Sequence, residues 1–146
     1  MDRARPKWVS GDTTTRGRTA LIVSILLVIA LVHIFRVGTY LRGSLFTLYY
    51  SYFSDIVVPF GMYFLLCLND VYLLFLRDWR VKAVLVFGVA SFTEVMQAFG
   101  VPLLGQTFDF LDLVMFGVGV LLAALVDRFL FDRHLPWWTP KMRDPS

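Results

Sequence analysis

The chain has 146 residues, enough for one compact domain. Hydrophobic residues make up 58% of it and charged residues 17%, against about half and about a quarter in soluble domains. The excess lies in continuous apolar runs, which indicates that lipid is the solvent for most of the chain. The formal net charge is +3, but the basic residues lie beside apolar runs. That placement is typical of membrane orientation and contact with anionic headgroups, and we expect no nucleic-acid partner.

The first apolar run follows a polar and basic start. Residues 1–18 contain five Lys or Arg and also Trp8, a suitable interfacial anchor, and no A-x-A-like cleavage site follows the run. We therefore predict a retained membrane helix over 19–37. The next residues, 36–54, are rich in Tyr and Phe, so we predict an interfacial segment that lies on the membrane surface and is partly helical.

The second span is predicted over 55–76. Two starts stay open: either Ser54 caps the helix and Pro59 falls in its second turn, or the helix begins at Pro59, where the ring is favoured. Near the far end of this span, Asp70 is most simply paired with a cation of the loop that follows, Arg80 or Lys82.

The third span is predicted over 81–99, and Gly100 with Pro102 after it forms a common helix-stop signal. Thr107 is the expected N-cap of the fourth span. We predict that this last span covers 108–131.

The distribution of cations orients the four spans. Five Lys or Arg precede the first span, three lie between the second and third, and four follow from Arg128 onward, whereas Arg36 and Arg42 fall on the other side. By the positive-inside rule, this bias predicts that both termini are cytoplasmic. We therefore expect an all-α integral membrane four-helix bundle, multi-pass and N-in/C-in, in the inner or plasma membrane. Its single domain covers 1–146, with cytoplasmic tails at 1–18 and 132–146.

In that orientation, several polar side chains fall in the outer third of the bundle. Ionisable groups in segments this apolar are costly and usually face a bundle interior or a water-filled cavity. We therefore predict a polar cluster that binds a ligand or holds the helices together. Its members are His33, Arg36, Asp55, Glu94, Gln97, Asp109 and Asp112.

Helical phase adds a second constraint. Asp112 and Gly119 share a face of the fourth span, where small residues at Gly119 and Ala123 let another helix approach closely. Because a short loop joins the third and fourth spans, Glu94 should lie level with Asp112. Two adjacent carboxylates in a low dielectric need a cation or a proton. The candidates for that cation are Arg36, Arg42, protonated His33 or a bound metal ion.

Simpler interpretations stay open for most of these residues. In the simpler interpretation, Asp55 and Asp109 stabilise helix starts and have no further role. His33 and Arg36 can be solvated where a helix meets water. Glu94 is different, because it lies too deep for easy solvation and has no cation within a turn of its own helix.

Sequence motifs for enzymatic chemistry are missing. The chain has no Gly-rich phosphate loop and no H-E-x-x-H zinc motif. His33 and His134 are predicted on opposite sides of the membrane, and the single Cys67 excludes an internal disulfide and is interpreted as a small hydrophobic residue. We therefore expect no cofactor, no metal and no catalytic residue, although acid/base work by Glu94 with Asp112 stays open.

The stretch from Glu94 to Gly119 has the pattern of a known group. Glu94 and Gln97 form an E-x-x-Q on one span, and an Asp and a Gly follow on the next after a short loop. On the second span, Asp55 and the aromatic residues after it look similar to a D-K-x-x-H-F-x-x-Y stretch. Over residues 54–127 the chain therefore resembles the VanZ-like family of small bacterial multi-pass membrane proteins.

This resemblance implies a four-span bundle in a bacterial or archaeal cell membrane. It also implies a loose association with the cell envelope and with glycopeptide resistance. Ile56 and Pro59 stand where the family's stretch has Lys and His. The cations that would balance Glu94 and Asp112 are therefore replaced.

Three functions follow as hypotheses. The first is a VanZ-like, non-catalytic membrane protein whose outward-facing acidic cluster holds a lipid or cell-envelope ligand. The second, favoured by the replaced cations and by 14 Phe in the chain, is an accessory or structural subunit packed against a larger membrane protein complex. The third is a proton-coupled transporter or membrane enzyme that uses Glu94. The expected partners are membrane lipids and, under the second hypothesis, that larger complex.

Overall fold

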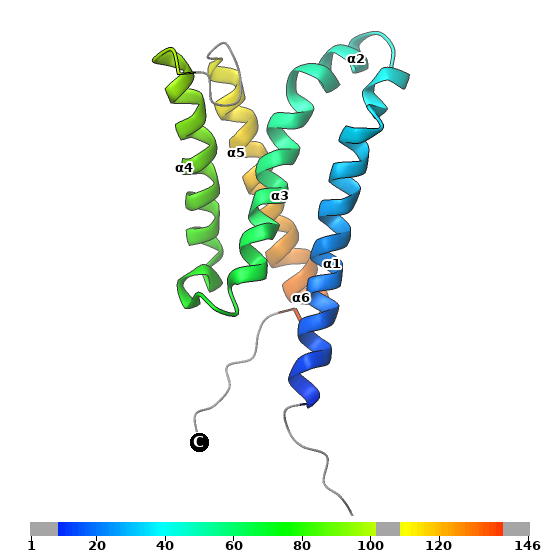
Figure 1. Cartoon of the computed structure of the whole chain (residues 1–146), viewed down its shortest axis with the longest axis vertical. Helices are drawn as coiled ribbons and strands as arrows, with labels where there is room; N and C mark the ends of the chain where they lie inside the picture. The colour runs from blue at the N-terminus through cyan, green and yellow to red at the C-terminus, as the bar shows by residue number, and fades with distance from the viewer. Residues whose placement is uncertain (1–8, 102–108, 139–146) are drawn as a thin grey trace, which may run out of the picture.

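The computed structural model of the chain describes residues 9–101 and 109–138, and within these ranges the side chains of 15–36, 38–47, 49–101 and 109–138. All regular secondary structure of the described part is helical, without strands (Figure 1). The helical elements are α1 (Val9–Ile34), η1 (Val37–Tyr40), α2 (Ser44–Leu48), η2 (Tyr49–Phe53), α3 (Ser54–Asn69), η3 (Leu74–Arg77), α4 (Trp79–Ala98), α5 (Phe110–Leu125), η4 (Val126–Phe131) and α6 (Asp132–His134).

Four helical runs of the described residues are long and apolar enough to cross a membrane. They are Thr15–Ile34, Ser44–Asn69, Trp79–Ala98 and Phe110–His134. A membrane-spanning helix needs about 20 apolar residues, and each run reaches that length. The predicted all-α architecture with four span-length helices is therefore confirmed.

The central helix of the bundle is α3, which packs against α1, α4 and α5, while α4 packs against α5. In Figure 1, α1 lies along one side of α3 and α4 lies on the other. The first helix begins and α6 ends at the same end of the bundle, which we call the termini end. The opposite end carries α2 and the start of α5, and we call it the acidic end because Asp55, Glu94, Asp109 and Asp112 gather there.

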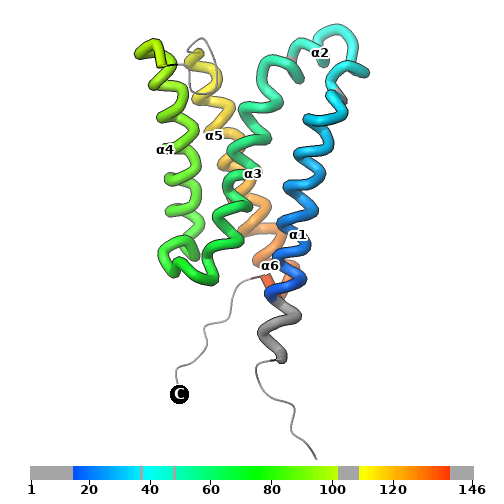
Figure 2. Tube along the Cα trace, viewed as in Figure 1, coloured from blue at the N-terminus to red at the C-terminus, as the bar shows by residue number. Residues whose placement is uncertain are grey.

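The second span differs from its predicted form at both ends. The chain is already helical from Ser44, through α2 and the π-helical η2, so part of the expected interfacial segment continues directly into α3; Figure 2 shows the bend between α2 and α3. Pro59 lies buried inside α3, not at its start. Proline cannot donate to the carbonyl four residues before it, a common cause of helix bending. The helix ends at Asn69, earlier than the predicted end near Leu76.

The last span begins later than predicted. Asp109, rather than Thr107, is the N-cap of α5, and its carboxylate accepts a hydrogen bond of 2.9 Å from the Leu111 N–H. A side-chain oxygen at this position satisfies one of the backbone donors that a helix start leaves unpaired. The predicted cap Thr107 and the predicted anchor Trp8 lie outside the described residues.

The hydrophobic core lies in the half of the bundle nearer the termini end. It combines residues from every span and a tryptophan after α6: Ile22, Tyr63, Phe64, Cys67, Val86, Val120, Ala123, Ala124 and Trp138. The helices α5 and α3 approach closely at Gly119, where a Cβ would lie 2.1 Å from the Ile56 carbonyl oxygen. The prediction that Gly119 allows another helix to approach closely is confirmed.

Candidate functional site

At the acidic end, four carboxyl groups from three helices lie close together. The carboxyl groups of Asp55, at the start of α3, and Asp112, in the first turn of α5, are within hydrogen-bonding reach of each other. Both also lie within electrostatic range of Glu94 and Asp109. The antiparallel packing of α4 and α5 and the contact of α5 with α3 produce this arrangement.

Glu94 is the most deeply placed of the four acids. It is only 3% exposed, and its Oε1 accepts a hydrogen bond of 2.8 Å from the backbone N–H of Asp109. The side chain therefore ties α4 to the first residues of α5. An ionised acceptor strengthens such a bond, and a carboxylate at a helix N-terminus also interacts favourably with the helix dipole.

No ion pair to this cluster is present within the described part of the chain. The ion pairs there all lie at the termini end. Of the predicted cation candidates, Arg36 and Arg42 are exposed and form no ion pair, and His33 lies against the Ser54 hydroxyl rather than in an ion pair. Like charges at close range in a partly buried site repel one another, so the four acids need protons or an external cation.

The remaining residues of the predicted cluster take other positions. The Nε2 atom of His33 lies 3.3 Å from the Ser54 hydroxyl, and its ring centroid lies 5.7 Å from that of Phe53, so this ring meets the start of α3 next to Asp55. Arg36 follows the end of α1 in a left-handed conformation, with φ of 49°. Gln97 is half-buried, one turn beyond Glu94 on α4.

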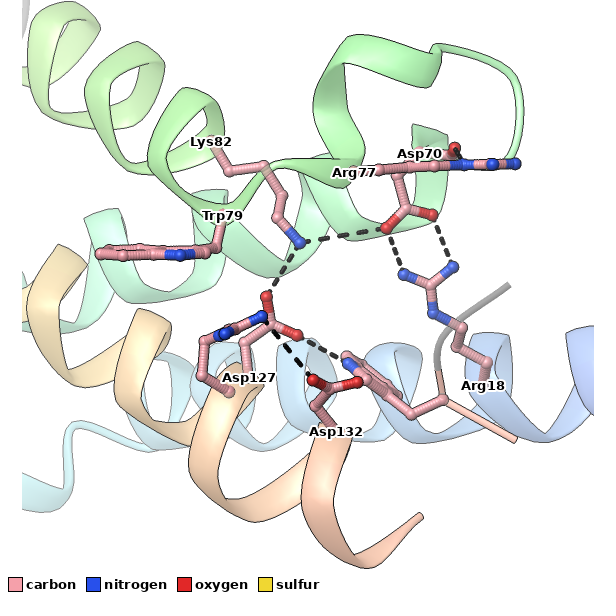
Figure 3. A pocket seen from close by; sticks show the side chains of 9 residues that line it. Arg18, Asp70, Arg77, Trp79, Lys82, Asp127 and Asp132 are labelled. Carbon is pink, nitrogen blue, oxygen red and sulfur yellow. Dashed lines mark hydrogen bonds and ion pairs between the residues drawn. The ribbon is translucent and has the colours of Figure 1, made fainter. Parts of the chain in front are cut away.

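The termini end holds a second polar site, formed by Arg18, Asp70, Lys82 and Asp127, which we call the four-ion cluster. Each of these residues is at most 5% exposed. Arg18 donates from both terminal nitrogens to the two oxygens of Asp70, and the Lys82 ammonium lies 2.9 Å from Asp127 Oδ2 and 3.9 Å from Asp70 Oδ2. Figure 3 shows Arg18 and Lys82 approaching Asp70 from different helices.

Neutral donors complete the environment of Asp127. The Tyr63 hydroxyl donates to its Oδ2 at 2.7 Å, and the Trp138 indole N–H donates to its Oδ1 at 2.6 Å. The Lys82 ammonium also lies 3.1 Å from the Cys67 sulfur and 5.0 Å from the centroid of the Tyr63 ring. With two cations, two carboxylates and satisfied oxygens, the cluster meets the conditions under which buried charges are tolerated.

This cluster was not predicted as a site. Arg18 and Lys82 were counted among tail and loop cations, and the predicted partner of Asp70 was a cation of the following loop. In the structure Arg18 is its main partner, and Lys82 is a more distant one. Asp127 was overlooked, although helical phase could have found it. It shares a face of the last span with the buried residues Val120, Ala123 and Ala124.

A cavity of about 80 Å³ lies beside the four-ion cluster. The cavity walls come from the first, third and fourth spans, from the α3–α4 connection and from Trp138. They consist of Arg18, Asp70, Arg77, Trp79, Lys82, Asp127, Arg128, Asp132 and Trp138. Arg77 reaches it from η3, where its Nε donates to the Asp70 carbonyl oxygen at 3.3 Å.

Within the described residues, no three His, Cys, Asp or Glu side chains are arranged to hold a metal ion. Comparisons with protein-family profiles, curated proteins and solved structures find no match to the chain. The resemblance to the VanZ-like family therefore stays a prediction, and function has to be argued from the two polar sites.

Proposed function

We propose that this chain is a non-catalytic, multi-pass membrane protein that holds an amphiphilic ligand against the carboxylates of its acidic end. The observation that carries the proposal is the contact between Asp55 and Asp112, beside Glu94 and Asp109, with no ion pair to any of these acids in the described residues. A ligand with a positively charged group would relieve the repulsion among these acids. Lipids and cell-envelope components that carry an amine have this chemistry.

The proposed ligand would enter from the membrane, because the cluster lies where spans begin and end. Asp55 opens α3 and Asp112 lies in the first turn of α5. Groups at this depth can meet a headgroup while the acyl chains stay along the apolar helix faces. Together with the resemblance to VanZ-like proteins and the cation bias, this supports a cell-membrane location with cytoplasmic termini and the acidic end outside.

The test is the set of lipids that copurifies with the full chain from native membranes, identified by mass spectrometry. We expect wild type to retain an amphiphile with a cationic group, and Asp55→Asn and Asp112→Asn to lose it. Asp144→Asn removes one carboxylate from the C-terminal tail and should leave the retained ligand unchanged. Identical lipids in all four proteins would contradict the proposal.

A second candidate function is an accessory subunit of a larger membrane complex. The observation in its favour is the poor coverage of α1, because only 11% of its most apolar stretch is buried inside the structure, against 22% to 33% for the other three spans. The same purification tests it: a stoichiometric protein partner that crosslinks to α1 would favour this function. A chain that purifies alone with its ligand would favour the first.

A transporter or enzyme that uses Glu94 has weaker support. The Glu94 carboxylate accepts a hydrogen bond from the backbone N–H of Asp109. This contact links α4 to the start of α5, which is a structural role. A group that shuttles protons needs an exchange partner within hydrogen-bond reach.

A further inference from the structure

The cavity at the termini end has an excess of positive charge. Four cationic side chains line it, Arg18, Arg77, Lys82 and Arg128, against three carboxylates. Its volume of about 80 Å³ is several times the roughly 10–15 Å³ that one water molecule requires. The space is therefore large enough for a small polar group and carries a charge that favours an anion.

The carboxylates that line this cavity are already occupied. Asp70 receives both terminal nitrogens of Arg18, and Asp127 receives Tyr63, Lys82 and Trp138. Their oxygens therefore have little capacity left to pair the remaining cations of the cavity.

Two arginines have donors to spare. Arg77 uses its Nε on a backbone carbonyl, and Arg128 forms a long ion pair of 3.8 Å with Asp132. A guanidinium carries five N–H donors in a planar fork that matches phosphate oxygens. These two side chains can therefore bind an anion without breaking the four-ion cluster.

A buried donor beside the cavity also lacks an acceptor. Arg18 is 5% exposed, and its Nε has no hydrogen-bond partner, although both of its terminal nitrogens are paired. A buried donor left unpaired costs about 1–3 kcal/mol, so such groups usually have a partner. A phosphate oxygen in the adjacent cavity would be an acceptor for a donor of this kind.

The cavity lies at the ends of the candidate spans, where lipid headgroups are expected. Its walls are built where the first span begins, the second ends, the third begins and the fourth ends. Trp79 and Trp138 line it, and tryptophan is enriched at the membrane interface. One wall reaches the surface, because the side chains of Arg128 and Asp132 are 54% and 38% exposed.

We propose that this cavity binds the phosphate group of an anionic membrane lipid, with Arg77 and Arg128 as its direct ligands. Basic pockets between membrane helices bind anionic headgroups in this way. The site is separate from the acidic end and does not depend on the function proposed there.

The experiment measures lipid binding to the full chain in detergent by native mass spectrometry. The probes are phosphatidylglycerol, phosphatidylcholine and inorganic phosphate. The test variants are Arg77→Gln and Arg128→Gln. The matched controls are Arg80→Gln, whose guanidinium stacks over Trp79 at 5.6 Å, and Arg133→Gln, because both remove a neighbouring cation that does not line the cavity.

We expect wild type to bind phosphatidylglycerol more tightly than phosphatidylcholine. Each test variant should weaken phosphatidylglycerol binding about fivefold, the effect of roughly one cation near an anionic headgroup, while each control changes it less than about twofold. Arg77 is partly exposed and Arg128 exposed, outside the buried cluster, so the thermal midpoints of the variants should stay close to that of wild type.

Three results would overturn the proposal. Equal losses in all four variants would mean general attraction to the basic surface. Equal binding of the two lipids to wild type would remove the need for an anionic site. Displacement of phosphatidylglycerol by inorganic phosphate at lower concentration than the lipid itself would make free phosphate, and not a lipid, the ligand.

Discussion

Arg18 and Asp70, which are separated in the sequence by the first two spans, form a two-pronged ion pair at the termini end, with N–O distances of 2.5 Å. The pair ties the start of the first span to the end of the second. The guanidinium also lies over the Trp138 ring, 4.9 Å from its centroid, so the last described residue belongs to the same assembly. The helix α3 ends at Asn69, directly before the aspartate that the arginine holds.

The first prediction concerns this pair. Arg18→Gln and Asp70→Asn should each lower the free energy of unfolding by about 3–5 kcal/mol, because each leaves a buried charge without its main partner. Chemical unfolding in mixed micelles, followed by circular dichroism, measures the loss.

The double variant Arg18→Leu with Asp70→Leu serves as the comparison, because replacing both charges of a buried pair with apolar groups is often close to neutral. It should recover most of the lost stability. If it is no more stable than the single variants, packing of the two side chains, and not their charge, holds the spans together.

The second prediction concerns the close approach of α5 to α3. Gly119→Ala should lower the thermal midpoint, because the added Cβ would lie 2.1 Å from the Ile56 carbonyl oxygen and force the two helices apart. We expect a loss of about 1–3 kcal/mol, the usual cost of an added methyl group in a packed core.

Gly88→Ala is the matched control for this substitution. Nothing lies within 4 Å of a Cβ at Gly88, and alanine is favoured over glycine inside a helix by about 1 kcal/mol. Its midpoint should therefore stay unchanged or rise. Equal losses at both glycines would show that the approach of α5 to α3 is not a tight contact.

The third prediction separates the charge of Glu94 from its role as an acceptor. Glu94→Gln keeps an oxygen that can accept the Asp109 N–H and should fold with nearly wild-type stability. Glu94→Ala removes that acceptor and should cost about 1 kcal/mol, the net worth of a hydrogen bond whose donor is only partly buried. The thermal midpoints of the two variants, measured in the same detergent, show whether the charge or the acceptor is needed. A Gln variant as unstable as the Ala variant would mean that the negative charge itself is required.

The fourth prediction concerns orientation. Single cysteines are introduced as Arg42→Cys and Arg80→Cys in a Cys67→Ala background, and intact cells are labelled with a membrane-impermeant maleimide. We expect labelling at position 42 alone, because the cation bias places that residue outside and position 80 inside. Both positions are exposed, so access to each reports the side of the membrane. Labelling of position 80 instead would reverse the proposed orientation of both sites.

The sequence by itself determined that the chain is helical and has four runs able to span a membrane. A long hydrophobic run in lipid has to satisfy its own backbone hydrogen bonds, and a helix does so. It also singled out Glu94 and the acids near it, since carboxylates stand out in apolar segments, and it found Gly119 through helical spacing.

Only the tertiary structure decided which charges meet. Arg18 and Lys82 look like ordinary flanking cations in the sequence, because nothing in a linear pattern distinguishes a solvated arginine from one paired with an aspartate in another span. Pairing depends on which helices are neighbours and on their rotation, and both are set by packing around α3. The same packing sets the end of α3, the start of α5 and the position of the basic cavity, because each depends on a contact between residues far apart in the chain.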